Sequence, residues 1–191
     1  MSENKSHELF LALWHSADQL RSKMEASEFQ SYILGLVFYK YLSDKLLTES
    51  TEMIDHKGTD LDEALVNYTK LYTTKDATLS TDYSLSPELT FQSLLHEIDD
   101  QTFQREHLQQ ALSEIEQSNI AYKDIFGDLD LSSNELGAFP EKKNETIANI
   151  MKEFRQLNLS EYQGDVLGDA YEYLINQFAA ISGKKTGEFY T

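Results

Sequence analysis

One stretch decides the fold of this 191-residue chain: residues 27–42, with the sequence SEFQSYILGLVFYKYL. Its apolar residues cover almost every side of a helix, and a helix that is apolar all round is buried inside a protein. Ser27 followed by Gln30 has the form of a capping box, which predicts that the helix begins there. Gly35 costs about 1 kcal/mol of helix propensity, and we expect a close crossing by another helix to offset it. The sequence thus predicts a central buried helix from Ser27 towards Leu47.

Helical spacing of apolar residues recurs on both sides of this stretch. It predicts one helix from about His7 to Ser22 and another from Leu61 to Tyr72. Ser86 and Pro87 then have the form of an N-cap followed by proline at the first helical position. Four later helices are expected, and each has its own apolar positions: Leu89, Phe91, Leu94, Leu95 and Ile98; Leu108, Ala111, Leu112 and Ile115; Ile147, Ile150, Met151, Phe154 and Leu157; Val166, Leu167, Ala170, Tyr171, Leu174, Phe178 and Ile181.

The segments between these helices have the composition of loops. Residues 73–86 are rich in Thr, Ser and Asp, with a short extended piece expected at 83–85. Residues 118–140 are expected to be irregular and held by apolar anchors at Ile120, Ile125, Phe126, Leu129 and Leu131. Any strand pairing would be a small accessory near Tyr83 or Leu129. We predict an all-α fold, a multi-helix bundle.

The composition excludes several kinds of chemistry. The chain has no cysteine, so disulfides, thiolate catalysis and cysteine-bound zinc are excluded. Its histidines lack metal-ligand spacing. No nucleophile elbow of the form G-x-S-x-G occurs. Gly183-Lys184-Lys185-Thr186 resembles the end of a phosphate-binding loop, but position 178, where that loop needs glycine, is Phe178. We interpret Gly183 as a helix C-cap followed by two lysines that complement the helix dipole.

The charge balance bears on partners and location. The formal net charge is −17, from 33 acidic and 16 basic residues. Proteins that bind nucleic acid usually carry a net positive charge, so we do not expect this chain to bind DNA by itself. Arg21 and Lys23, or Lys142 and Lys143, are local basic spots that we interpret as solvated surface. The start of the chain has no signal-peptide character and residues 33–39 are too short to span a bilayer, so we expect a soluble, cytoplasmic protein without a membrane partner.

Two groups of motifs near the ends of the chain carry a family resemblance. The first group consists of LWHSADQLR at 13–21, MEASEF at 24–29 and LGLVFYKYLSD at 34–44. The second consists of DVLGDAYEYLI at 165–175 and GKKTGEFYT at 183–191, with ALSEIE at 111–116 between the groups. In this order they resemble the modification (M) subunit of type I restriction–modification systems.

The resemblance implies a domain organisation and a function. Residues 1–182 would be the helical N-terminal domain, and 183–191 the linker and first residues of a Rossmann-like methyltransferase domain that the sequence otherwise lacks. The full subunit would use S-adenosylmethionine to methylate adenine N6 in DNA. It would work with a specificity subunit, a second modification subunit and restriction subunits, and reach DNA through that complex. By position, Glu188, Phe189, Tyr190 and Thr191 match the family element that contributes to the cofactor pocket.

The residues themselves limit what these 191 residues do alone. The adenine-methylating motif Asn-Pro-Pro-aromatic is absent, because no two prolines are adjacent. No G-x-G occurs for the glycine-rich cofactor turn. We therefore expect a non-catalytic assembly domain that binds no cofactor by itself. Two alternatives stay open: a free-standing acidic mimic of DNA that inhibits restriction enzymes, and weak S-adenosylmethionine binding through the terminal element.

Overall fold

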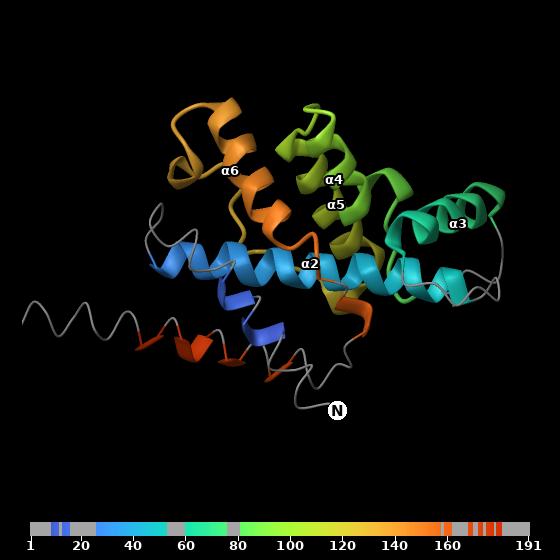
Figure 1. Cartoon of the computed structure of the whole chain (residues 1–191), viewed down its shortest axis with the longest axis horizontal. Helices are drawn as coiled ribbons and strands as arrows, with labels where there is room; N and C mark the ends of the chain where they lie inside the picture. The colour runs from blue at the N-terminus through green and yellow to red at the C-terminus, as the bar shows by residue number, and fades with distance from the viewer. Residues whose placement is uncertain are drawn as a thin grey trace, which may run out of the picture.

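The computed structural model shows helices around one long central helix (Figure 1). It describes residues 9–11, 13–15, 26–52, 60–75, 81–157, 159–161, 168–169, 172–173, 175–177 and 179–180. Among these residues no strand occurs, so the all-α prediction is confirmed for them, and no strand pairing is present at Tyr83 or Leu129.

The central helix, α2, spans Ala26–Glu52. It is buried along its length, as its apolar sequence predicts, with Ile33, Leu36 and Leu46 fully shielded from solvent. The capping-box prediction is wrong, because Ala26 is already helical and Ser27 lies inside the helix. The helix also continues beyond Leu47 to Glu52. The buried Ser50 and Thr51 hydroxyls bond back to helix carbonyls and so need no other partner.

Three helices cover one side of α2 (Figure 1). They are α4 (Phe91–Asp99), α5 (Arg105–Ser118) and α6 (Pro140–Glu153), and α3 (Leu61–Thr74) packs near the end of α2. Short 3₁₀ turns connect them: η1 (Pro87–Leu89), η2 (Ile120–Tyr122), η3 (Asn134–Leu136) and η4 (Leu159–Glu161). On the other side of α2 lie helical residues from 9–15 and from 168–180.

The helix that was expected to start at Ser86 begins later. Pro87 opens only the 3₁₀ turn η1, and the Ser86 side chain makes no capping hydrogen bond. Thr90 has an extended backbone and its side chain caps α4 by accepting the Ser93 N–H. The chain therefore breaks at Thr90, because its extended backbone cannot continue the turn into α4. By contrast, Pro140 does occupy the first position of α6.

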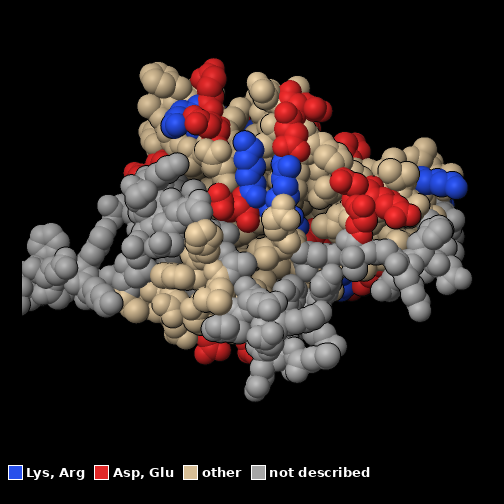
Figure 2. Space-filling model, in the orientation of Figure 1, with Lys and Arg blue, Asp and Glu red and all other residues tan. Residues whose placement is uncertain are grey.

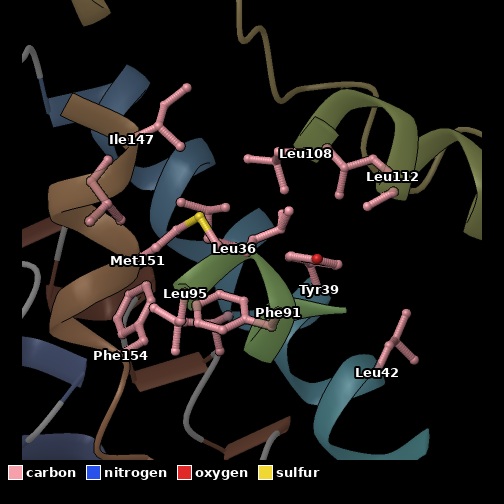
Figure 3. Packing of buried hydrophobic residues seen from close by; sticks show 14 of the residues in the cluster. Leu36, Tyr39, Leu42, Phe91, Leu95, Leu108, Leu112, Ile147, Met151 and Phe154 are labelled. Carbon is pink, nitrogen blue, oxygen red and sulfur yellow. The ribbon is translucent and has the colours of Figure 1, made fainter. Parts of the chain in front are cut away.

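The core is the junction of α2, α4, α5 and α6. Figure 3 shows side chains from all four helices meeting there, with Leu36 and Tyr39 of α2 facing Phe91 of α4. The Tyr39 and Phe91 rings lie 5.6 Å apart between centroids. Irregular residues also enter the core, since Phe126, Leu129 and Leu131 of the 118–140 segment are buried as predicted. The other two expected anchors are wrong: Ile120 is 82% exposed and Ile125 is 43% exposed.

Buried tyrosine hydroxyls join loops and helices by donating hydrogen bonds to backbone carbonyls. Tyr39 donates to the Leu89 carbonyl, Tyr68 to the Leu85 carbonyl and Tyr83 to the Leu42 carbonyl, at 2.5, 2.5 and 2.7 Å. Tyr32 donates to the Asp130 carbonyl in the same way. Burial raises the pKa of Tyr39, Tyr68 and Tyr83, because the apolar surroundings disfavour the phenolate. Each tyrosine hydroxyl thereby has a hydrogen-bond partner inside the protein.

Gly35 allows a close approach, although not by a helix. A Cβ placed at Gly35 would lie 3.2 and 3.3 Å from the two methyl carbons of Leu129. Leu129 belongs to the irregular segment after α5. The expected crossing helix is therefore replaced by a loop side chain, which fills the space that a larger residue would take.

Candidate functional site

The most unusual feature of α2 is a buried ion pair. The Lys40 ammonium lies 2.8 Å from Oδ2 and 3.1 Å from Oδ1 of Asp44, and both side chains are 1% exposed. The same ammonium lies 4.8 Å from the centre of the Phe91 ring, within the range of a cation–π interaction. The spacing of four residues puts both groups on one face of the helix. Because both are shielded from solvent, this pair joins elements and offers no reactive group to a substrate.

The pair also holds the backbone beyond α6. Asp44 Oδ2 accepts the N–H of Leu159 at 2.9 Å, and one helical turn further on Thr48 donates to the Ser160 hydroxyl at 2.8 Å. Beside them, the Ser43 hydroxyl accepts the Phe91 N–H at 2.8 Å. We call Lys40, Ser43, Asp44 and Thr48 the polar seam. It fixes η4 and the start of α4 against α2.

Burial acts on the two charges of the seam in opposite directions. It lowers the pKa of Lys40 and raises that of Asp44, since an apolar site disfavours any charged form. Their mutual attraction opposes both shifts, and the Leu159 N–H also opposes the rise in the pKa of Asp44. A buried pair of this kind tends to specify geometry rather than add stability. Here the geometry specified is the position of η4.

A groove lies along the other half of α2. Its volume is about 640 Å³. Three walls enclose it: α2 from Gln30 to Tyr41, the loop from Ile125 to Leu129, and Gly168 with Ile175. Most of the lining is apolar, and Asp128 is its one charged residue among those described. The early and late parts of the chain also contact each other, because the rings of Phe10 and Tyr173 stack with centroids 5.1 Å apart.

The structure describes only some of the site residues that the sequence predicts. Glu188, Phe189, Tyr190 and Thr191 lie outside the described residues, as do Arg21 and Lys23. The basic spot at Lys142 and Lys143 is engaged within the protein: Lys142 pairs with Glu145 at 2.7 Å, and Lys143 donates to the Ser132 carbonyl. On the face drawn in Figure 2, Lys and Arg atoms lie beside Asp and Glu atoms and form no separate basic patch.

The described histidines include two that pair with carboxylates. His96 lies 2.7 Å from Asp62 and His107 lies 2.9 Å from Glu97. Within the described part of the chain, no group of three His, Asp or Glu side chains is placed to hold a metal ion. Nor does any helix searched there have the length and apolarity needed to cross a membrane.

Sequence reasoning missed the polar seam. In the sequence, Lys40 directly follows the apolar run of residues 33–39. The available signal was the pair of opposite charges at Lys40 and Asp44, four residues apart in a helix expected to be buried on all sides. Such charges must be paired inside the protein. The partner at Leu159 is 115 residues away, and no local pattern identifies it.

Comparison with known proteins places this geometry in a family. Residues 11–154 match the HsdM N-terminal domain, and residues 162–191, directly after η4, match N-6 DNA Methylase. The chain is 26% identical, over 94% of its length, to the type I restriction enzyme MpnII methylase subunit of Mycoplasma pneumoniae and to the MjaIX methylase subunit of Methanocaldococcus jannaschii. It spans 36% and 32% of the lengths of these relatives.

A solved structure agrees with this placement. The methyltransferase subunit of a type I restriction–modification system from Streptococcus thermophilus is 48% identical and superposes with a TM-score of 0.85, covering 91% of this chain and 39% of that one. The family match extends over residues 11–154 of the 191. The chain therefore belongs to the HsdM N-terminal domain family of type I restriction–modification methylase subunits, and its last 30 residues match the start of an N-6 DNA methylase domain.

Proposed function

We propose that this chain is the assembly part of an adenine-specific type I methylase subunit. Its helices would contact the specificity subunit and a second modification subunit, restriction subunits would join that complex, and DNA would be reached through it. The observation that supports the proposal is the order of the two family matches, the HsdM N-terminal domain over residues 11–154 and N-6 DNA Methylase over residues 162–191.

The polar seam supports this proposal physically. Asp44 and Thr48 hold Leu159 and Ser160 of η4, the last described turn before that match begins. A helical domain that assembles a complex must keep a fixed direction relative to the domain that carries the chemistry. Directional hydrogen bonds from a buried helix provide such a constraint, since a hydrogen bond weakens steeply when its angle changes.

The chemistry itself would belong to the full subunit. S-adenosylmethionine would supply the methyl group for adenine N6, and Glu188, Phe189, Tyr190 and Thr191 would form one edge of its pocket. The described residues do not fit this cofactor, because none of them is in a strand and their glycines, Gly35, Gly127, Gly137 and Gly168, stand singly. We therefore derive no methyl-transfer step from them. The domain boundary between 182 and 183 remains part of the proposal.

The test is association with the proposed partners. The 191-residue chain carrying an affinity tag is mixed with the specificity subunit of its own system, and separately with a full-length modification subunit. We expect at least one of them to be retained at 0.15 M salt and to co-sediment with the chain. Retention of neither partner, by a chain shown to be folded by circular dichroism, would overturn the assembly role.

A further inference from the structure

The groove beside α2 has the features of an interaction surface. Its volume of about 640 Å³ lies within the range of roughly 300–1,000 Å³ typical of binding clefts. Leu34, Val37 and Phe38 of α2 contribute apolar side chains to it. Ile125 and Ile175 stand on different walls and are 43% and 38% exposed. Large apolar side chains that stay exposed around one groove mark a site where another apolar surface is bound.

The charges around the groove select the kind of partner. No lysine or arginine is among its described lining residues, and Asp128 is one of them. In the sequence, Asp124 and Asp130 lie just outside the two ends of the loop wall, and Asp169 and Glu172 lie between Gly168 and Ile175. Hydrogen bonds from Ser132 keep the pKa of Asp130 low, so this carboxylate stays charged. Asp128 repels phosphate and attracts cations, so the described lining favours a basic partner over a nucleic-acid backbone.

We propose that this groove binds an amphipathic helix of a partner subunit, one with an apolar face flanked by lysines or arginines. The apolar face would lie on Leu34, Phe38 and Ile125, and the basic flank would face Asp128. This arrangement is the helix-in-groove mode of recognition, in which apolar residues at positions i, i+3, i+4 and i+7 enter the groove. The inference rests on the proposed assembly function and adds the site and the chemistry of its partner.

Gly168 allows the groove to be blocked without disturbing the fold. It lines the groove in a helical segment, and a Cβ built on it meets no atom within 4 Å. Gly168→Phe therefore has room for its ring to extend over the opening. Gly168→Ala is the matched control, because it makes the same change of backbone flexibility without filling the groove.

The probe is a fluorescein-labelled 18-residue peptide with leucine at i, i+3, i+4 and i+7 spacing and lysine elsewhere. Binding to the 191-residue chain is followed by fluorescence anisotropy at 0.15 M salt. We expect saturable binding that falls at least about tenfold in Gly168→Phe and is unchanged in Gly168→Ala. A scrambled peptide of the same composition should bind at least about tenfold more weakly, since it has the charge but not the apolar face.

The charge of the groove is tested separately. Asp128→Lys should weaken binding of the peptide about tenfold. Asp100→Lys, an identical charge change at an exposed position just after α4, should have less than about a twofold effect. Equal losses in both variants would show that the net charge attracts the peptide and would overturn the groove as the site. Circular dichroism and thermal unfolding confirm that each variant is folded.

The outcomes separate this inference from the assembly function. If Gly168→Phe binds the lysine peptide as well as the unchanged chain does, the inference is overturned. If the specificity or modification subunit is still retained by Gly168→Phe, assembly stands but uses another surface. If sedimentation shows that the chain is a dimer that Gly168→Phe dissociates, the occupant is a second copy and the proposed partner is wrong.

Discussion

The two halves of α2 meet the rest of the chain in different ways. The second half is joined by directional polar contacts, from Asp44 to Leu159 and from Thr48 to Ser160. The first half is joined mainly by apolar contacts, beside the hydrogen bond from Tyr32 to the Asp130 carbonyl, and leaves a groove of about 640 Å³ open. Apolar burial is non-directional, whereas a hydrogen bond fixes an angle. The second half of α2 therefore fixes the position of η4, which directly precedes the residues that match N-6 DNA Methylase. The first half leaves the surface that we propose for a partner.

The largest expected effect comes from breaking the polar seam. Asp44→Ala leaves the Lys40 ammonium buried without its partner and the Leu159 N–H without its acceptor. We expect a loss of about 3–5 kcal/mol in the free energy of unfolding, the usual cost of an uncompensated buried charge. Urea denaturation followed by circular dichroism measures it.

The matched control is the double variant Lys40→Met with Asp44→Leu. It removes both charges and fills the space with apolar atoms, so most of the lost stability should return. The Leu159 amide should nevertheless exchange its hydrogen faster than in the unchanged protein, because its acceptor is absent. Equal stability of the single and double variants would contradict the view that an unpaired charge causes the loss.

The second-largest expected effect is a fall in the free energy of unfolding at alkaline pH, where the buried tyrosines ionise. The pKa values of Tyr39, Tyr68 and Tyr83 are raised in the folded protein. Their contribution is fully present below the pKa of an unfolded tyrosine, about 10, and is lost as the pH rises through the folded pKa. Above pH 10 each tyrosine should lower the free energy of unfolding by about 1.4 kcal/mol per pH unit.

The variant Tyr68→Phe tests this prediction. The variant removes one titrating hydroxyl, so the slope of stability against pH above 10 should become shallower by about 1.4 kcal/mol per unit. At pH 7 it should lose about 1 kcal/mol, because the Leu85 carbonyl no longer accepts its hydrogen bond. Urea denaturation at pH 7 gives the loss, and urea denaturation between pH 9 and 11 gives the slope. An unchanged slope would show that Tyr68 does not titrate in this way.

A smaller effect distinguishes the two glycines that line the groove. Alanine favours a helix over glycine by about 1 kcal/mol. Gly168→Ala meets no atom within 4 Å and should stabilise the protein by up to that amount. Gly35→Ala brings its Cβ to 3.2 Å from Leu129, so its gain should be about 1 kcal/mol smaller. Thermal unfolding of both variants tests the difference, and equal shifts would mean that Leu129 moves freely.

The smallest expected effect is at the end of the polar seam. Thr48→Val keeps the shape of the side chain and removes its hydrogen bond to Ser160. We expect a loss of about 0.5–1.5 kcal/mol, the net value of a typical hydrogen bond. Urea denaturation of Thr48→Val and of Ser160→Ala should give similar losses that do not add in the double variant. Fully additive losses would show that the two hydroxyls act independently.

Several parts of this architecture were predictable from the sequence because they depend on local patterns. The central helix was predicted from its run of apolar residues, and α3 and α5 from helical spacing. Helix starts were less predictable. Ser27 has the residue type of a cap but lies inside α2, and the cap of α4 is Thr90 instead of Ser86. A capping residue is defined by its backbone conformation, which the side-chain type favours but does not fix.

The anchors of the irregular segment show the same limit. Phe126 and Leu129 are buried as predicted, whereas Ile120 is 82% exposed and Ile125 lines the groove. Outside regular structure no periodicity tells which apolar side chains face inward. The groove was not predicted either, because its described walls come from residues 30–41, from residues 125–129 and from Gly168 and Ile175.

The sequence by itself determined the all-helical class, the buried central helix and, through the resemblance of its end motifs, the family. These properties are carried by residue types at short spacing, where helix periodicity links pattern to burial. Only the tertiary structure decided that Lys40 and Asp44 hold Leu159, that Leu129 fills the space beside Gly35, and that a groove stays open. Each of these depends on contacts between residues about 90 or more positions apart, which the packing of the helices brings together.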